Sequence, residues 1–256
     1  EIHYYIIVRE KMNRIDVRTL RYRRCDPSDD IMINIDCEGC PDGEQFPTVE
    51  AALKYIDGLE GLDTLREFDM THLFLPEFPD IIKKMKGLTS LNISRNEIKE
   101  IPLYLCELTD LEYLDLSYNQ IERVPNCIGN LTRLELFDLD GNRLIELPAT
   151  IGDLKNLKSL YLNGDHLKEL PNSLGQLSQL EILELSKNDL TALPESIEQL
   201  KNLEELEMGG NTGFENPEVL LNLERLNYLR TIDTPIKGLS EELIAKIEQN
   251  GTDFYY

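Results

Sequence analysis

Aliphatic residues recur through most of the chain with a constant period of 23 residues. The clearest copy is LEYLDLSYNQIERVPNCIGNLTR, from Leu111 to Arg133. The other regular copies begin at Leu88, Leu134, Leu157, Leu180 and Leu203, with a looser copy at Leu65 and a truncated one at Leu226. Within a copy, apolar residues occupy positions 1, 4, 6, 11, 14, 18 and 21, Asn occupies position 9 and Pro position 15. Constant spacing over so many copies predicts a repeat protein.

The spacing also predicts the elements of one copy. Positions 4 to 6 alternate apolar, polar and apolar, which indicates a short strand with one buried face. Positions 14, 18 and 21 have the spacing of a helical or 3-10 segment, and proline at position 15 suits its first turn. A single coil of this size cannot bury its own apolar face, so the coils must stack. Stacking aligns the strands into a parallel sheet roughly 34 Å long, at about 4.8 Å per strand.

The asparagine at position 9 is expected to connect neighbouring coils. It occurs as Asn96, Asn119, Asn142, Asn188 and Asn211. A carboxamide both donates and accepts hydrogen bonds, so it can satisfy backbone groups where the strand turns inward. Leu73 and Asp165 depart from this column. We expect Asp165 to be largely buried and to destabilise the fold, unless His166, Lys187 or a bound cation is its dedicated partner.

The first eleven positions, L-x-x-L-x-L-x-x-N-x-L, resemble the leucine-rich repeat. The 23-residue form, with Leu-Pro followed by I-x-x-L, is similar to the Ras-group class, which includes intracellular scaffolds, plant relatives and bacterial proteins. The resemblance covers roughly Leu65 to Leu239. It implies an α/β fold, namely a leucine-rich-repeat solenoid with a parallel concave sheet and short 3-10 or helical convex segments, capped at both ends. It also implies protein binding, usually on the concave sheet.

Three parts of the chain are predicted. Residues 1–61 form an N-terminal cap of antiparallel strands and a helix, residues 62–239 the repeats, and residues 240–256 a C-terminal capping helix and tail. In the cap, strands are expected over 3–9, 17–25 and 31–37. Thr48 is expected to cap a helix over 49–56. Seven basic and two acidic residues lie between Arg9 and Arg24. They form either a contact site or a strand face that is solvated or that docks on an acidic neighbour.

The five cysteines are not expected to form a disulfide framework, because their number is odd and their spacing irregular. Cys106 and Cys127 fall in the back segments of successive repeats, where we interpret them as small apolar or surface residues. Cys37 and Cys40 have the spacing of a zinc or redox motif, but no second pair exists to complete a zinc site. No metal site or cofactor is predicted.

The formal charge of -22 argues against nucleic acid and anionic membranes as partners. No stretch approaches the roughly 18 apolar residues of a membrane helix. The first residue is Glu1, so the sequence is expected to be a fragment or a processed form, from which a signal peptide could have been removed. The compartment is left open, with a cytoplasmic location favoured.

Function is expected on the outward strand positions 3, 5, 7 and 8. They combine carboxylates with aromatic and aliphatic anchors, a combination typical of protein-binding surfaces. The predicted partner-binding residues are Asp69, Tyr113, Asp115, Tyr118, Leu136, Asp138, Asp140, Tyr161, Ile182, Glu184 and Glu207. Their charge predicts a protein partner with a basic surface.

Other functions are weighed against this one. The chain has no nucleophile or phosphate-binding motif, and His3, His72 and His166 are far apart, so no enzyme is predicted. The alternative is a structural or sensing module of a larger protein, secreted or an effector, with the N-terminal segment as an adaptor. A weaker possibility is divalent cation binding by the acidic column.

Overall fold

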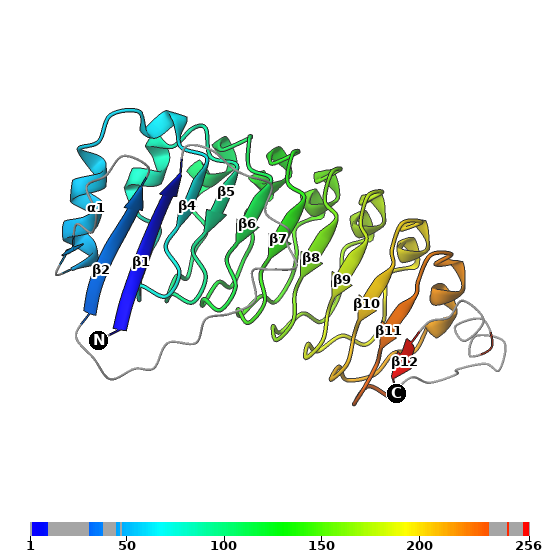
Figure 1. Cartoon of the computed structure of the whole chain (residues 1–256). Helices are drawn as coiled ribbons and strands as arrows, with labels where there is room; N and C mark the ends of the chain where they lie inside the picture. The colour runs from blue at the N-terminus through cyan, green and yellow to red at the C-terminus, as the bar shows by residue number, and fades with distance from the viewer. Residues whose placement is uncertain are drawn as a thin grey trace.

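The structure, a computed structural model, describes residues 48–235 and Ala245 in full, and the backbone of the strands 2–9, 31–37, 45–46 and 253–255. One open sheet of 12 strands runs the length of the molecule, in the order β12-β11-β10-β9-β8-β7-β6-β5-β4-β1-β2-β3. Short 3-10 helices lie behind it along the stack (Figure 1). We number the repeats 1 to 8 by their first leucines, from Leu65 to Leu226.

Each repeat contributes one short strand, and all eight repeat strands run parallel. They are β4 (Glu67–Asp69), β5 (Ser90–Asn92), β6 (Tyr113–Asp115), β7 (Leu136–Asp138), β8 (Ser159–Tyr161), β9 (Ile182–Glu184), β10 (Glu205–Glu207) and β11 (Tyr228–Arg230). The pairing register advances by one repeat at each step, so that Leu114 lies beside Phe137 and Phe137 beside Leu160. The predicted solenoid with a parallel sheet is therefore confirmed.

A 3-10 helix forms the back of each of repeats 1 to 7, and one more, η2, precedes repeat 1. These helices are η2 (Leu62–Thr64), η3 (Asp80–Lys84), η4 (Leu103–Glu107), η5 (Asn126–Asn130), η6 (Ala149–Asp153), η7 (Asn172–Gln176), η8 (Glu195–Gln199) and η9 (Pro217–Asn222). In η4 to η8 the repeat proline precedes the helix in an extended conformation, with φ -71° and ψ 146° for Pro102. Its carbonyl accepts the first helical hydrogen bond, from the N–H of Leu105 at 3.0 Å. Proline thus fixes the entry to the helix, one residue before the predicted first turn.

The apolar positions of the repeat fill a single continuous core between the sheet and the back helices. In repeat 3, Leu111, Leu114, Leu116, Ile121 and Ile128 are all fully buried. Neighbouring coils contribute the same positions, so each leucine packs against its counterparts above and below. The core therefore belongs to the stack and not to any one coil, as the period predicted.

The asparagine column ties the coils together by side-chain hydrogen bonds. Asn119 is typical: its Oδ1 accepts the N–H of Ile98 in the preceding repeat at 3.1 Å. Its Nδ2 donates to the carbonyl of Ile93 in that repeat at 3.1 Å and to Leu116 in its own at 3.0 Å. Each buried carboxamide therefore satisfies backbone groups of two coils that no strand ladder reaches.

Asp165 occupies the same column, but as a carboxylate it can only accept hydrogen bonds and cannot donate them. It is 3% exposed, and its Oδ1 accepts the N–H of Leu144 at 2.8 Å. Its Oδ2 has no hydrogen-bond partner within the described residues. The carbonyls of Leu139 and Leu162 each accept one asparagine N–H, whereas that of Leu116 accepts two. The predicted burial of Asp165 is confirmed.

Burial raises the pKa of the Asp165 carboxyl to about 8, and repulsion from Asp140 adds to it, while the N–H groups of Leu144 and Asn142 act in the opposite direction. In the unfolded chain the carboxyl ionises near pH 4. Folding therefore binds a proton between about pH 4 and pH 8, and stability falls as the pH rises through this window. A protonated Asp165 can donate from Oδ2, as asparagine does.

Asp165→Asn is therefore expected to stabilise the protein by on the order of 1–3 kcal/mol at pH 8, since it restores the missing donor. The gain should shrink as the pH falls from 8 towards 4, because Asp165 is then protonated in the folded state and can donate from Oδ2 as asparagine does. Denaturant melts across this pH range measure it, and Asn188→Asp should produce the reverse effect. A gain that does not change with pH, or a loss of stability, would contradict this account.

The N-terminal segment extends the same sheet. β1 (Ile2–Arg9) pairs antiparallel with β4, and β3 (Gln45–Phe46) pairs antiparallel with β2 (Ile31–Cys37). β1 and β2, however, pair directly and in parallel, whereas the predicted meander has the strand over 17–25 between them. A parallel pair needs a long return connection, and the 21 residues between Arg9 and Ile31 are long enough to supply one. The strand expected over 17–25 and the basic residues near it lie outside the described residues.

The predicted helix after this segment is present as α1 (Val49–Asp57). The side chain of Thr48 accepts the N–H of Ala51 at 3.1 Å and caps it. Ala52 and Ile56 are fully buried in the common core. At the other end, β12 (Asp253–Tyr255) pairs in parallel with β11. The C-terminal helix predicted from residue 240 falls, apart from Ala245, outside the described residues, as do Cys40 and the side chain of Cys37.

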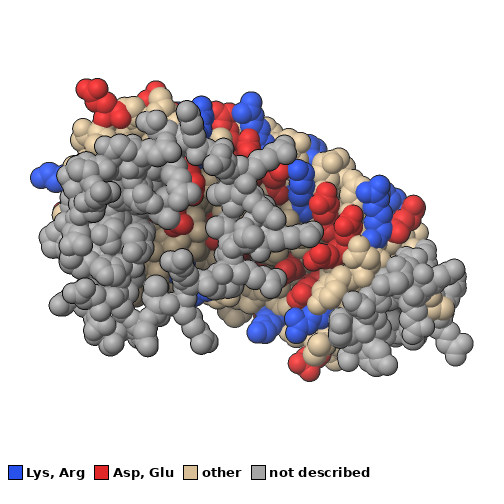
Figure 2. Space-filling model, viewed as in Figure 1, with Lys and Arg blue, Asp and Glu red and all other residues tan. Residues whose placement is uncertain are grey.

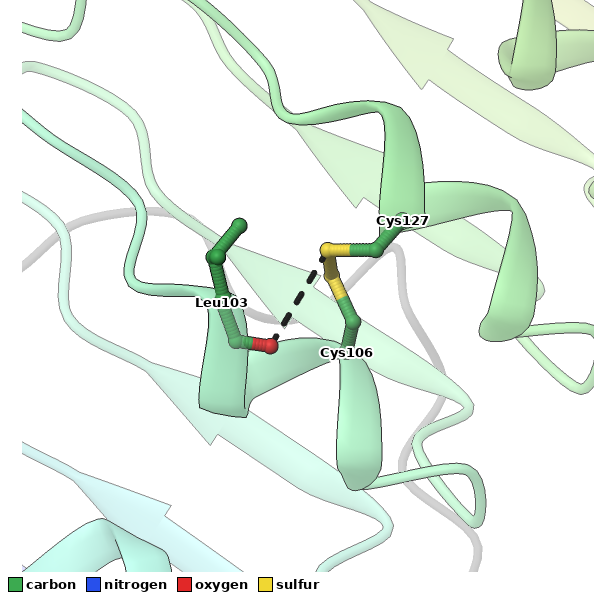
Figure 3. The surroundings of a disulfide bond; sticks show 3 residues. All are labelled: Leu103, Cys106 and Cys127. Carbon is green, nitrogen blue, oxygen red and sulfur yellow. Dashed lines mark hydrogen bonds between the residues drawn. A yellow bond between two sulfur atoms is a disulfide. The ribbon is translucent and has the colours of Figure 1, made fainter.

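Cys106 and Cys127 form a disulfide, with their Cα atoms 5.7 Å apart, so the interpretation of them as unpaired residues is wrong (Figure 3). They occupy position 19 of repeat 2 and position 17 of repeat 3. The same two positions of successive repeats also meet at the three following junctions, and we call this line of four contacts the back seam. The next junctions hold Gly129 against Thr150, Gly152 against Ser173 and Gly175 against Ser196.

The back seam has no room for side chains larger than those present. A Cβ atom added to Gly152 would lie 2.4 Å from the carbonyl oxygen of Ser173. The hydroxyls of Thr150, Ser173 and Ser196 are buried without hydrogen-bond partners in this part of the chain, so small size and not polarity accounts for them. The disulfide thus replaces a close glycine–serine contact with a covalent bond.

The double variant Cys106→Gly with Cys127→Ser recreates the Gly152–Ser173 contact at this junction. We expect it to fold, because the three following junctions use that chemistry. It should be less stable by about 3 kcal/mol, the stabilisation typical of a disulfide closing a loop of this length. Denaturant melts with and without reductant measure the loss. If reductant does not lower the stability of the native protein, no disulfide contributes to it.

Candidate functional site

The side chains at positions 3 and 5 form two columns along the outer side of the sheet. Strand pairing aligns position 3 in the order Glu67, Ser90, Tyr113, Leu136, Ser159, Ile182, Glu205 and Tyr228. It aligns position 5 in the order Asp69, Asn92, Asp115, Asp138, Tyr161, Glu184, Glu207 and Arg230. We call this surface, with positions 7 and 8, the strand face. All the predicted partner-binding residues lie on it, including Asp140 at position 7 and Tyr118 at position 8.

Acidic residues gather on the strand face of the middle repeats, and basic residues lie mainly along its two edges (Figure 2). Several edge residues pair with carboxylates of the neighbouring repeat, as Lys158 does with Glu135 at 2.8 Å and Arg133 with Asp110 at 2.7 Å. Exposed pairs of this kind contribute little to stability. Because these basic residues lie at the edges, the middle of the strand face is occupied mainly by carboxylates.

In repeats 1 to 4 the position 5 residue closes the end of its own strand. Asp69, Asn92, Asp115 and Asp138 each accept, through Oδ1, the N–H of the residue two positions later, at 2.9 to 3.0 Å. In the first three repeats that later residue is Thr or Ser, and its hydroxyl donates to the same oxygen. Part of this acidic column is therefore explained by turn formation.

From repeat 5 onward the strand ends are closed differently, because Tyr161 and Glu184 cannot form this turn. The residue at position 7 of the preceding repeat takes over. Oδ1 of Asp140 accepts the N–H of Asn163 at 2.6 Å, and Oδ1 of Asn163 accepts that of Ser186 at 2.7 Å. Nδ2 of Asn163 also donates to Asp140 and to Glu184, so one carboxamide links three repeats.

Position 8 carries the edge of the face on a left-handed backbone. φ is +57° at Arg95, +53° at Tyr118 and +65° at Gly141. The guanidinium of Arg95 lies 4.5 Å from the centre of the Tyr118 ring. That ring covers Gly141, where an added Cβ would lie 2.9 Å from it. Tyr118 is 45% exposed, so it is a fixed aromatic surface and not a loose side chain.

The apolar residues of the face differ in accessibility. Tyr113, Tyr161 and Ile182 are half-buried. Leu136, which the sequence placed among the exposed anchors, is only 5% exposed. The accessible anchors of the described face are therefore mainly aromatic, with Ile182 as the aliphatic exception.

The carboxylates of the strand face are crowded and partly buried. Burial, with repulsion from Asp115, Asp140 and Glu184, raises the pKa of Asp138 well above its ordinary value. Burial also raises the pKa of Asp115 and of Asp140, against the effect of their hydrogen bonds. The pKa of Glu184 rises to about 7, chiefly through burial and with repulsion from Asp140, Glu207 and Glu205, although the Asn163 hydrogen bond lowers it.

This arrangement suits recognition of a positively charged group, because a cation relieves the repulsion among the carboxylates. No group of three or more His, Cys, Asp or Glu within the described residues is arranged to hold a metal ion. None of the described helices has the length and apolarity needed to cross a bilayer.

Sequence reasoning missed Asn163 and Arg95 as members of the site. Asn163 stands at position 7, where most repeats carry small or short polar residues, so its column gave no signal. A signal was available in repeat 5, where Tyr at position 5 removes the local acceptor for the strand end. Arg95 was overlooked because its stacking on Tyr118 depends on the left-handed turn.

Asp115→Asn is expected to leave the free energy of unfolding unchanged or slightly raised, because Asn keeps the Oδ1 acceptor and removes a crowded charge. Asn92 already makes this turn in the native protein. Asp115→Ala removes the acceptor and should cost about 1 kcal/mol. Denaturant melts of both variants measure the difference. Equal effects of the two substitutions would show that the turn does not matter.

Two families match the sequence. A leucine-rich repeat family matches residues 86–144, and a leucine-rich repeat region matches residues 136–249. With the parallel sheet and the back helices, these matches establish that the chain is a leucine-rich-repeat protein. Domains of this kind are typically surfaces for protein–protein interaction and not catalysts. No curated protein matches the chain at a significant level.

Several solved structures share the fold. A leucine-rich-repeat protein of Leptospira interrogans is 30% identical, with a TM-score of 0.72 over 88% of this chain and 53% of the other. An internalin of Listeria monocytogenes is 22% identical, with a TM-score of 0.62 over 74% and 52%, and supports the fold alone. The Arabidopsis receptor kinase HAESA, in complex with the peptide hormone IDA and the co-receptor SERK1, is 29% identical, with a TM-score of 0.55 over 62% and 28%. This chain thus spans about half the length of the first two proteins.

Proposed function

We propose that the strand face binds a protein partner by contacting a basic surface on that partner. The observation that carries the proposal is the strand register, which collects Asp69, Asp115, Asp138, Glu184 and Glu207 into one column. Tyr113, Tyr118, Tyr161 and Ile182 lie among these carboxylates. Aromatic anchors in a charged field provide both affinity and orientation at interfaces. The net charge of -22 speaks against nucleic acid and anionic membranes as ligands.

The comparisons support the class of function. HAESA, a structural neighbour, is seen in complex with a peptide hormone and a co-receptor. The 23-residue period with its Leu-Pro and I-x-x-L signature supports placement in the Ras-group class. A stack of eight short strands also presents a continuous surface that a single coil cannot.

Neutralising the column tests the proposal without disturbing the turns. The variant carries Asp115→Asn, Asp138→Asn, Glu184→Gln and Glu207→Gln, and it should fold, since Asn keeps the turn acceptor. Affinity capture with native protein identifies the partner, and the dissociation constant is then measured with purified components at two salt concentrations. We expect at least roughly tenfold weaker binding and a reduced salt dependence.

The matched control removes four exposed charges that lie off the strand face: Glu100→Gln, Glu122→Gln, Glu169→Gln and Glu195→Gln. It should bind as the native protein does. If the strand-face variant binds its partner as tightly as the native protein, this surface is not the binding site.

A second candidate is a sensing or structural module of a larger exported protein. The Cys106–Cys127 disulfide favours it, because such bonds persist in oxidising compartments and are rare in the cytosol. This observation points away from the cytoplasmic location that the sequence suggested. Alkylation of intact source cells, followed by peptide mass spectrometry, should find both thiols protected; free thiols at Cys106 and Cys127 would remove the support.

A further inference from the structure

We propose, resting on the proposed function, that the strand face recognises an arginine side chain of the partner, seated against Tyr161 and Glu184 over β8 to β10. The patch is a small block of aligned residues. Tyr161, Glu184 and Glu207 are neighbours in one column, and Ile182 and Glu205 are neighbours in the other. All five side chains are half-buried. Their alignment places one aromatic ring, one aliphatic side chain and three carboxylates within two strand spacings.

The chemistry of this block favours a guanidinium over an ammonium. A guanidinium is planar, stacks on aromatic rings and donates in a fork that matches carboxylate oxygens. Tyr161 supplies a ring directly beside the Glu184 carboxylate. Glu205 and Glu207 lie one strand further along and provide acceptors for the remaining donors.

The protein itself already makes both halves of this contact on the strand face. Arg95 stacks over Tyr118 at 4.5 Å from the ring centre. Arg230 approaches Glu207 from the next repeat, with its Nη1 3.5 Å from Oε2. Over β8 and β9, by contrast, a ring and a carboxylate lie side by side, and the described residues place no arginine between them.

The other end of the face is less suitable. Asp115 and Asp138 are committed to closing their own strands. Asp69 and Tyr118 make further interactions within the chain, and Leu136 is buried. Among the described residues, Glu184 accepts a single side-chain hydrogen bond, from Nδ2 of Asn163, and it closes no strand end. A bound cation also relieves the repulsion from Asp140, Glu205 and Glu207 that raises the pKa of Glu184.

The probes are two short synthetic peptides, one alternating arginine and leucine and the other alternating lysine and leucine. They carry the same charge, so nonspecific attraction to an acidic protein affects them equally. Fluorescence anisotropy of labelled peptides measures their dissociation constants with the full chain. We expect the arginine peptide to bind the native protein several-fold more tightly than the lysine peptide.

Three variants locate the contact. Tyr161→Leu should abolish the preference for arginine, because stacking is lost while apolar volume is kept. Glu184→Gln should weaken binding of the arginine peptide about tenfold, the order of effect expected for a close charge pair. Glu169→Gln removes the same charge from an exposed residue off the strand face, and it should change the affinity less than twofold.

The outcomes separate this inference from the proposed function. Equal affinity for the two peptides, no measurable binding, or equal weakening by Glu169→Gln and Glu184→Gln would each overturn the arginine site. The variant with four neutralised carboxylates would still bind the captured partner more weakly if the strand face is the binding surface. Unchanged partner binding by that variant overturns the proposed function instead.

Discussion

The side-chain hydrogen bond from one coil to the next is the interaction on which the rest of the structure depends. Each coil turns inward after only three strand residues, and this turn leaves buried backbone groups without ladder partners. The asparagine at position 9 supplies a donor and an acceptor in one side chain, so the turn can be buried at no cost in unpaired groups. Asp165 shows the requirement by partial failure, since its carboxyl satisfies the acceptor half alone.

That constraint also shapes the strand face. Because the ladder fixes every coil in the same register, the side chains at positions 3 and 5 must form columns. Aspartate or asparagine at position 5 of the first four repeats has a structural role in closing strands. Where Tyr161 and Glu184 replace it, Asp140 and Asn163 take over that role from the preceding repeat. The change releases position 5 for other chemistry in the later repeats.

The period of the sequence was sufficient to predict the sheet, the columns and the core, because each follows from repetition alone. It was insufficient wherever two different positions meet. Cys106 and Cys127 are 21 residues apart and not 23, so they were not recognised as neighbours until the back seam was known. The burial of Leu136 and the stacking of Arg95 on Tyr118 likewise depend on side-chain packing. The parallel pairing of β1 with β2 depends on a connection that carries no repeat.

The back seam has a consequence for how such a chain can grow. At the junctions from Gly129 to Ser196 each contact pairs a glycine with a small hydroxyl residue, so a whole repeat duplicated or deleted there would meet the same kind of neighbour. The junction of repeats 2 and 3 is different. A coil inserted between them would separate Cys106 from Cys127, and the disulfide could not form. Among these four junctions, this is therefore the one at which the insertion of a repeat would remove a covalent bond.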